Sequence, residues 1–347
     1  MKTCAEQFPF EIWLMIYRYL EAHDLFYAFH HLNYYFEQIL ASNYLSFYIR
    51  FKEIDTNPYW SDSVLNRTIC LRTSTQLRSS YFLQFLHLNA KKLIRLQSLS
   101  ININSRNVSY TLSICKAVNE LSALRHLSLV CTLNENLFKS IISIQTLQIC
   151  QLVLRESTDI INNQLHVNSN IKQLTIIFLS NVNDTIINLF LIHLSELKRF
   201  EVSGSYFSFQ QASIFTTHLC TLSKLRILKL KLTNGHLTSD CFKYLHLIAP
   251  VLKHFYFHYN KHILSETFID DFMFYWWPII EQISYINIYI KGHLYIDIND
   301  NNTQMNLQKN QQILLNKMKK SNGSMKVEWT EQNFVPLKSI EINITKS

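Results

Sequence analysis

Apolar residues recur along most of the chain in one six-residue pattern, apolar-x-x-apolar-x-apolar. Successive copies begin 28, 25, 22, 26, 28, 27, 31 and 54 residues apart. The second half of each copy alternates in the way that is typical of a strand with one buried face. A short strand returning at a nearly constant interval predicts an array of repeated units. The copies begin at Leu96, Leu124, Ile149, Ile171, Leu197, Leu225, Leu252, Ile283 and Leu337, and a degenerate earlier copy begins at Asn66.

The segments between these strands carry apolar residues at helical spacing, such as Ile187, Leu191 and Leu194. Each strand–helix unit therefore has apolar surface on both sides, which only stacking against neighbouring units buries. We predict an α/β solenoid with a parallel concave sheet and helices on the convex side. The expected helices cover residues 111–122, 134–144, 183–196, 208–223, 239–249 and 265–282.

The residues between the apolar positions of each strand are expected to point outward and to form one continuous sheet surface. Charged residues gather in its middle strands and aromatic residues toward its C-terminal end. Because tyrosine and arginine are frequent interface anchors, these positions are candidate substrate-binding residues. The simpler interpretation is that they are solvent-facing positions of a sheet. The candidates are Arg199, Lys229, Lys231, His254, Tyr256, His258, Tyr285 and Tyr289.

The pattern changes near residue 295. A polar segment at residues 297–303 precedes a predicted amphipathic helix at residues 305–320. The interval of 54 residues before the last copy indicates a repeat altered by insertion. We interpret residues 295–347 as a capping region, and the copy at Leu337 as its last repeat strand.

Residues 8–40 have a different pattern, in which three runs of apolar residues at helical spacing predict three short helices. Pro9 suits the first turn of the first helix, where its missing N–H costs nothing. Asp24 and Asn33 are expected to cap the second and third helices. Three helices in so short a stretch cannot bury all of this apolar surface among themselves. Part of it must be covered by the repeats or by a partner.

One set of residues in this stretch stands in a characteristic order: Phe8-Pro9, Glu11-Ile12, Ile16, Tyr19-Leu20, Asp24-Leu25, Ala28, Leu32 and Phe36. In order and spacing they resemble an F-box, the helical module that docks a carrier protein onto a cullin–RING ubiquitin ligase. The later strands resemble an irregular array of leucine-rich repeats. The resemblance implies an F-box-like module at residues 1–42 and a repeat domain at residues 43–347. It also implies docking of a Skp-type adaptor by Phe8, Pro9, Ile12, Ile16, Leu20 and Leu25.

Composition narrows the classes of function. Hydrophobic residues make up 48% of the 347 residues, which suffices for a large core, and four glycines leave no Gly-rich phosphate loop. A formal net charge of +8 permits attraction to acidic partners. A nucleic-acid binder is therefore a third interpretation, although we do not expect nucleic acid as the partner; it predicts binding that falls steeply with salt.

No arrangement of residues indicates catalysis, and we expect no catalytic residue, no metal and no cofactor. His254, His258 and His262 are spaced too widely along a strand to share one ion, and His30-His31 is interpreted as a pair on a helix surface. The seven cysteines form no CxxC pair, which favours reduced core thiols. With no signal peptide or long apolar run, we expect a cytoplasmic or nuclear protein without a membrane segment.

Two functions fit these expectations. In the first, the chain is a non-catalytic substrate receptor of an SCF-type ubiquitin ligase, whose N-terminal helices bind the adaptor and whose repeat surface binds the target. In the second, it is a leucine-rich-repeat interaction scaffold without a ligase role, and the N-terminal helices only cap the solenoid. Adaptor binding by residues 1–42 distinguishes the two.

Overall fold

The computed structural model describes most of the N-terminal half of the chain and, in the C-terminal half, mainly the strands. Contacts divide the chain into two compact units, Met1–Leu152 and Val153–Ser347. None of the helices in the described part has the length and hydrophobicity to span a bilayer. The described residues are 5–51, 61–73, 79–102, 108–157, 169–179, 185–205, 222–233, 250–264, 280, 282–295, 308–309, 311–313, 316, 325–334 and 337–346.

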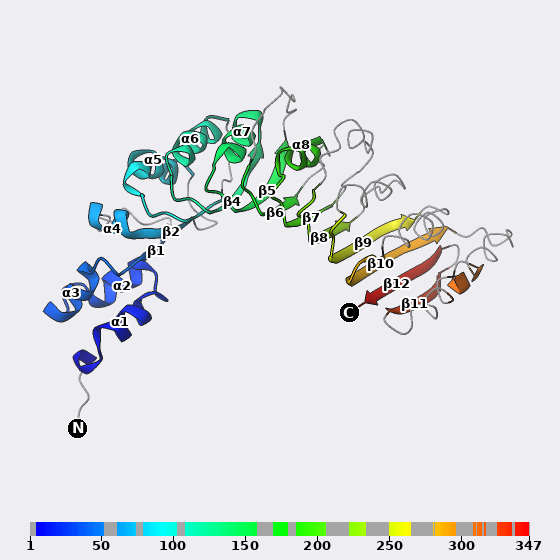
Figure 1. Ribbon diagram of the computed structural model, residues 1–347, viewed down its shortest axis with the longest axis horizontal. Coiled ribbons are helices and arrows are strands. Elements are labelled where there is room, and N and C mark those ends of the chain that lie inside the picture. Colours follow the sequence, from blue (N-terminus) through cyan, green and yellow to red (C-terminus); the bar gives the residue numbers. More distant parts are fainter. Residues whose placement is uncertain are drawn as a thin grey trace. The chain divides into compact units, whose positions relative to one another are not determined.

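The first unit begins with a short 3-10 turn, Ala5–Gln7, and three α-helices, as predicted (Figure 1). The helices are α1 (Phe10–Tyr17), α2 (Ala22–Phe29) and α3 (Tyr34–Ala41). Pro9 directly precedes α1 with φ −54°, a value compatible with a helix start.

One of the two predicted helix caps is confirmed. The side chain of Asn33 accepts a hydrogen bond of 3.1 Å from the backbone N–H of Phe36, which satisfies a donor at the start of α3. The predicted cap at Asp24 is wrong, because α2 already begins at Ala22, after Glu21. Asp24 lies instead in the first turn of α2, where its charge suits the helix dipole.

An aromatic cluster holds the three helices together. The ring of Trp13 lies edge-on to Tyr17, Phe29 and Phe36, with centroids 5.8, 5.8 and 5.0 Å away. Edge-to-face pairs of this kind stabilise a core beyond the area they bury. Nε1 of Trp13 also donates a 3.1 Å hydrogen bond to the carbonyl oxygen of Ala5. The inner face of α1 is therefore the one that carries Trp13 and Tyr17.

The rest of the first unit alternates strands and helices. Neighbouring strands pair in parallel from β1 to β4, and α5, α6 and α7 lie side by side along one face of the strands (Figure 1). The elements are β1 (Phe47–Phe51), α4 (Asp62–Arg67), β2 (Thr68–Thr73), α5 (Ser79–Asn89), η2 (Ala90–Lys92), β3 (Ser98–Asn102), α6 (Val108–Asn119), β4 (His126–Leu133), α7 (Glu135–Ser143) and β5 (Ile149–Ser157), whose last residues belong to the second unit.

The N-terminal helices rest on the first strand of this array. The ring of Phe26 on α2 lies 5.7 Å from that of Phe47 on β1. Glu21 and Arg50 form an ion pair of 3.6 Å between the start of α2 and the same strand. The strand array thus covers part of the apolar surface of the helices. Covering by the repeats is one of the two explanations expected from the sequence for this surface, the other being a partner.

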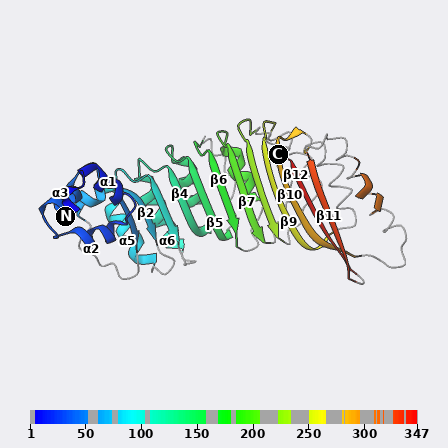
Figure 2. The same ribbon diagram turned by 90° about the horizontal axis from the view of Figure 1, so that it is seen from below.

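Among the described residues of the second unit, seven strands lie side by side in the order β6-β7-β8-β9-β10-β12-β11 (Figure 2). Pairing is parallel from β6 to β10. The strands are β6 (Gln173–Phe178), β7 (Arg199–Ser205), β8 (Ile227–Thr233), β9 (His254–Leu264), β10 (Tyr285–Tyr295), β11 (Met325–Phe334) and β12 (Leu337–Lys346), and α8 (Thr185–His193) follows β6.

Side-chain burial alternates along these strands as the repeat pattern predicts. On β8, Leu228, Leu230 and Leu232 are buried, whereas the residues between them face outward. Each of the nine repeat copies contains a strand, which in most copies begins at the third position of the motif. The prediction of a mixed α/β fold with a mostly parallel sheet is therefore confirmed.

The last strand, β12, does not run in the predicted direction. Leu337 was expected to begin a further repeat strand, but β12 pairs antiparallel with both β10 and β11. Only Val335 and Pro336 separate β11 from β12. So short a connection permits a hairpin, whereas a parallel crossover needs a dozen or more residues.

Three of the six predicted inter-strand helices are present, as α6, α7 and α8. The predicted helices at residues 208–223, 239–249 and 265–282 lie entirely or almost entirely outside the described residues. Within the helix predicted at residues 305–320, the described residues 308–309, 311–313 and 316 are helical. The polar segment at residues 297–303 lies outside the described residues.

Candidate functional site

The first candidate surface is the outer face of α1 and the turn after it. Ile12, Met15, Ile16 and Tyr19 stand at helical spacing opposite the inner face of α1. Met15 and Ile16 are exposed, and Tyr19 is 90% exposed. A surface helix normally turns a polar face to water. The apolar outer face of α1 is therefore a candidate docking surface.

The six predicted docking residues differ in how exposed they are in the structure. Phe8, Pro9 and Ile16 are exposed, and Ile12 and Leu20 are half-buried. Leu25 is 0% exposed, so its side chain belongs to the core of the helices and offers no surface to a partner. Sequence reasoning did not select Met15 or Tyr19 as docking residues, although Tyr19 is among the residues that carry the F-box resemblance. Met15 lies three residues after Ile12 and Tyr19 lies three residues after Ile16, and this helical spacing was the available signal.

The segment before α1 is held in place by the start of α3. The hydroxyl of Tyr35 donates a 2.7 Å hydrogen bond to the carbonyl oxygen of Phe8. Nδ2 of Asn33 donates one of the same length to Glu6. The ring of Phe8 lies edge-on to Trp13 at 6.3 Å and remains half-exposed. The backbone around Phe8 is thus fixed before any partner arrives, which lowers the entropic cost of binding.

The second candidate surface is the outward face of the sheet in the second unit. Strand register sets its residues in three rows across β7, β8, β9 and β10. All eight predicted substrate-binding residues are on this face, half-buried or exposed. The rows are Arg199, Ile227, His254 and Tyr285; Glu201, Lys229, Tyr256 and Asn287; and Ser203, Lys231, His258 and Tyr289.

Aromatic and imidazole rings on β9 and β10 pack against each other in these rows. His254 and Tyr256 lie 5.6 and 5.3 Å from the ring of Tyr285, and His258 lies 4.8 Å from the ring of Tyr289. These contacts restrict the rotamers of the rings. Rigid aromatic side chains lose little entropy on binding, so they make good anchors.

The charges on this face are only partly neutralised. Arg199 pairs with Glu201 at 3.2 Å. Nζ of Lys229 lies 4.8 Å from the ring centroid of Tyr256, a cation–π contact that leaves its charge in place. Neither Lys229 nor Lys231 has an ion-pair partner in the described part of the chain. The middle of the face therefore carries positive charge beside aromatic rings.

Burial and neighbouring charges shift three titrating groups here. Burial lowers the pKa of His258, and the ammonium of Lys231 lowers it further. Burial and the neighbouring Tyr285 raise the pKa of Tyr256. Burial and a hydrogen bond to Glu341 raise the pKa of Tyr289. These shifts favour the uncharged forms of His258, Tyr256 and Tyr289 near neutral pH, so the lysines supply the positive charge beside them.

Sequence reasoning missed two members of this face, Lys291 and Glu341, which form an ion pair of 3.5 Å. Lys291 lies on β10 beyond the six-residue motif, and β12 brings Glu341 beside it in antiparallel register. The alternation of apolar residues beyond Ile288 was a usable signal for Lys291. Nothing in the sequence pattern assigned a neighbour to Glu341.

Thiol chemistry is not favoured at the cysteines that the structure describes. Cys70, Cys131 and Cys150 are in no disulfide, and the last two are buried. Burial raises the pKa of the Cys150 thiol, with a smaller contribution from Cys131. A buried thiol of this kind is protonated and unreactive.

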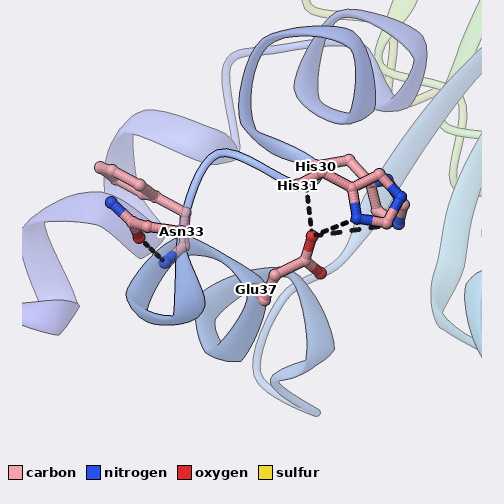
Figure 3. Close-up of polar contacts among 5 residues, drawn as sticks. His30, His31, Asn33 and Glu37 are labelled. Atoms are coloured by element: carbon pink, nitrogen blue, oxygen red, sulfur yellow. Dashed lines mark hydrogen bonds and ion pairs between the residues drawn. The ribbon is translucent and has the colours of Figure 1, made fainter.

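Among the described residues, His30, His31 and Glu37 form a group of possible metal ligands (Figure 3). His30-His31 was interpreted as a pair on a helix surface, but α2 ends at Phe29 and both residues follow it. His254 and His258 do face the same side of β9, as expected. The side chain of His262 lies outside the described residues.

The chain matches no protein-family model, and a comparison with curated proteins finds no match either.

Proposed function

We propose that this chain is a non-catalytic substrate receptor of an SCF-type ubiquitin ligase. One observation carries the proposal: α1 is apolar on two opposite faces, and among the described residues only the face with Trp13 and Tyr17 packs inside the chain. The exposed outer face carries Ile16 and follows Pro9, two of the residues on which the F-box resemblance rests. A Skp-type adaptor is the partner that this resemblance implies.

The outward face of the second unit is the proposed target-binding surface. The ammonium groups of Lys229 and Lys231, which have no ion-pair partner among the described residues, lie next to packed tyrosine rings. This combination suits a protein segment that carries acidic and apolar side chains. In this function the chain supplies no reacting group. It raises the effective concentration of a target lysine near the ligase-bound ubiquitin conjugate.

The second candidate function is a repeat scaffold without a ligase role. It is favoured by the contacts between Phe26 and Phe47 and between Glu21 and Arg50, which are those expected of a cap on the array. These contacts use α2 and do not involve the outer face of α1, which is exposed within the described part of the chain. The scaffold interpretation therefore predicts no loss of any partner when that face is changed.

Co-precipitation of the full chain with a Skp-type adaptor tests the proposal. Ile16→Asp, and separately Pro9→Ala combined with Ile12→Asp, should reduce adaptor retention at least about tenfold, the effect expected for interface anchors. Leu88→Asp is the matched control, because Leu88 is an exposed apolar residue on α5. Circular dichroism confirms that each variant is folded. Equal retention by all variants, or none by the unchanged chain, leaves the scaffold interpretation.

A further inference from the structure

The link between α2 and α3 gathers three side chains that commonly bind metal ions. His30 and His31 follow α2 directly, and Glu37 lies on the first turns of α3 (Figure 3). His31 has φ 63°, in the left-handed region that few residues other than glycine adopt. This conformation brings its ring to 3.7 Å, centroid to centroid, from that of His30.

Both imidazoles approach the same carboxylate oxygen. Nδ1 of His31 lies 3.8 Å from Oε1 of Glu37, and Nε2 of His30 lies 4.0 Å from it. The three potential ligand atoms all lie within 4.8 Å of one another. Two ligand atoms on one tetrahedral zinc ion are roughly 3.3 Å apart, given bonds of about 2.0–2.1 Å. Small side-chain rotations are therefore enough to close the group around an ion.

The carboxylate is held in place by the backbone. The N–H of His31 donates a hydrogen bond to Oε1 of Glu37 (Figure 3). The cap at Asn33 fixes the start of α3, so that Glu37 falls one turn into the helix and faces the link. A hydrogen bond that orients a ligating carboxylate is a usual feature of protein metal sites.

The group is open to solvent on one side. The side chain of His31 is 83% exposed, that of Glu37 is 36% exposed and that of His30 is 26% exposed. A hydrated ion can therefore reach all three residues. Three protein ligands also leave at least one coordination position for water or for a side chain of a partner.

We propose that His30, His31 and Glu37 bind one divalent transition-metal ion of the zinc class. Two imidazole nitrogens with one carboxylate oxygen suit zinc and its neighbours, whereas magnesium and calcium prefer oxygen ligands alone. The ion ties the end of α2 to the start of α3, next to the exposed side chains of Leu32 and Tyr34. This revises the expectation of no metal at His30-His31, which assumed a helix that in fact ends at Phe29.

The competing explanation is an ion pair between protonated histidine and Glu37, with no metal involved. Two variants separate the explanations with little risk to the fold. His31→Asn removes the imidazole but keeps a residue that tolerates positive φ. Glu37→Gln removes the charge but keeps an oxygen that can accept the N–H of His31. His126→Ala is the control, because it removes an exposed histidine on β4.

The test is calorimetric titration of the chelator-treated full chain with Zn²⁺. The unchanged chain and His126→Ala should share one stoichiometric site that both other variants weaken at least about tenfold. Zn²⁺ should also raise the thermal midpoint of the unchanged chain but not that of Glu37→Gln. Equal Zn²⁺ affinity in all four proteins, or no Zn²⁺ binding by the unchanged chain, overturns the metal site. Either result is independent of adaptor binding.

Discussion

Nη1 of Arg67 donates a 2.8 Å hydrogen bond to the carbonyl oxygen of Leu40, and so joins α4 to the end of α3. The same nitrogen donates to the carbonyl oxygen of Ser42, and the guanidinium lies 4.7 Å from the ring centroid of Phe47. Arg67 is only 6% exposed. One buried cation therefore satisfies backbone acceptors at the point where the N-terminal helices meet the strand array.

Arg67→Met should destabilise the first unit, because it removes the guanidinium donor from the carbonyl oxygen of Leu40 and one of two donors from that of Ser42, which also accepts from the N–H of Leu45. Hydrogen bonds to charged groups are each worth about 1.5–3 kcal/mol, so the loss of these two should lower the free energy of unfolding by about 3–6 kcal/mol. Urea unfolding of the full chain measures it. Arg72→Met is the control, because Arg72 is exposed on β2. A loss of similar size in both variants would contradict a specific role for Arg67.

Leu25 and Ile16 should respond in opposite ways to truncation. Leu25→Ala empties a buried position and should cost about 2–5 kcal/mol of stability. Ile16→Ala changes an exposed position and should alter stability by less than about 0.5 kcal/mol. Thermal unfolding with adaptor capture on the same samples checks both. If folded Leu25→Ala protein lost adaptor binding while Ile16→Ala protein kept it, the assignment of the two faces would be reversed.

Gly292→Ala should destabilise the second unit, although alanine usually suits a strand better than glycine. A Cβ at this position would lie 2.7 Å from the carbonyl oxygen of Lys261 and 2.6 Å from Cγ of Leu264. Both atoms belong to β9, where the register with β10 shifts beside Gly292. Overpacking of this kind costs about 1–3 kcal/mol. Chemical denaturation compares it with Asn287→Ala, an exposed position on the same strand that should be nearly neutral.

His258 should titrate below its ordinary pKa of 6.5. Because the folded-state pKa of His258 is lowered, the unfolded chain binds the proton more tightly than the folded chain does. The contribution of the neutral ring to folding stability is therefore fully present above pH 6.5 and is lost as pH falls through the folded-state pKa. Nuclear magnetic resonance titration measures the pKa, with His258→Gln to assign the signal. Lys231→Gln should raise the pKa but leave it below 6.5, because burial is the larger cause. A His258 pKa above 6.5 would show that the ring is not shielded in this way.

Much of the sheet could be predicted because burial has a simple period. The alternation of Leu228, Leu230 and Leu232 fixes which side of β8 is inside, and the outward positions of Lys229 and Lys231 follow without further information. The same reasoning placed Tyr256 and Tyr285 on the outward face. Their mutual distance could not be predicted, because it depends on strand register, which the pattern does not encode.

The direction of β12 and the cluster at Glu37 could not be predicted, for two physical reasons. The pattern of apolar residues indicates which side chains of a strand are buried, but not the direction in which the strand runs. Leu337, Ile340 and Ile342 would therefore form the same pattern in a parallel or an antiparallel strand. The approach of His31 to Glu37 depends on one positive φ angle in a residue that usually avoids it. The F-box resemblance pointed to the region, but the exposure of Met15 and the burial of Leu25 come only from how the helices pack.

The position of β12 also dictates an order of events during synthesis. Although β11 is made first, its neighbour in the sheet is β12, and β12 lies between β11 and β10. The sheet of the second unit therefore cannot reach its final arrangement until residues 337–346 have left the ribosome. Until then the edge of β10, with its unpaired backbone N–H and C=O groups, is open to other strands. A pause in translation just before Leu337 would prolong that exposure.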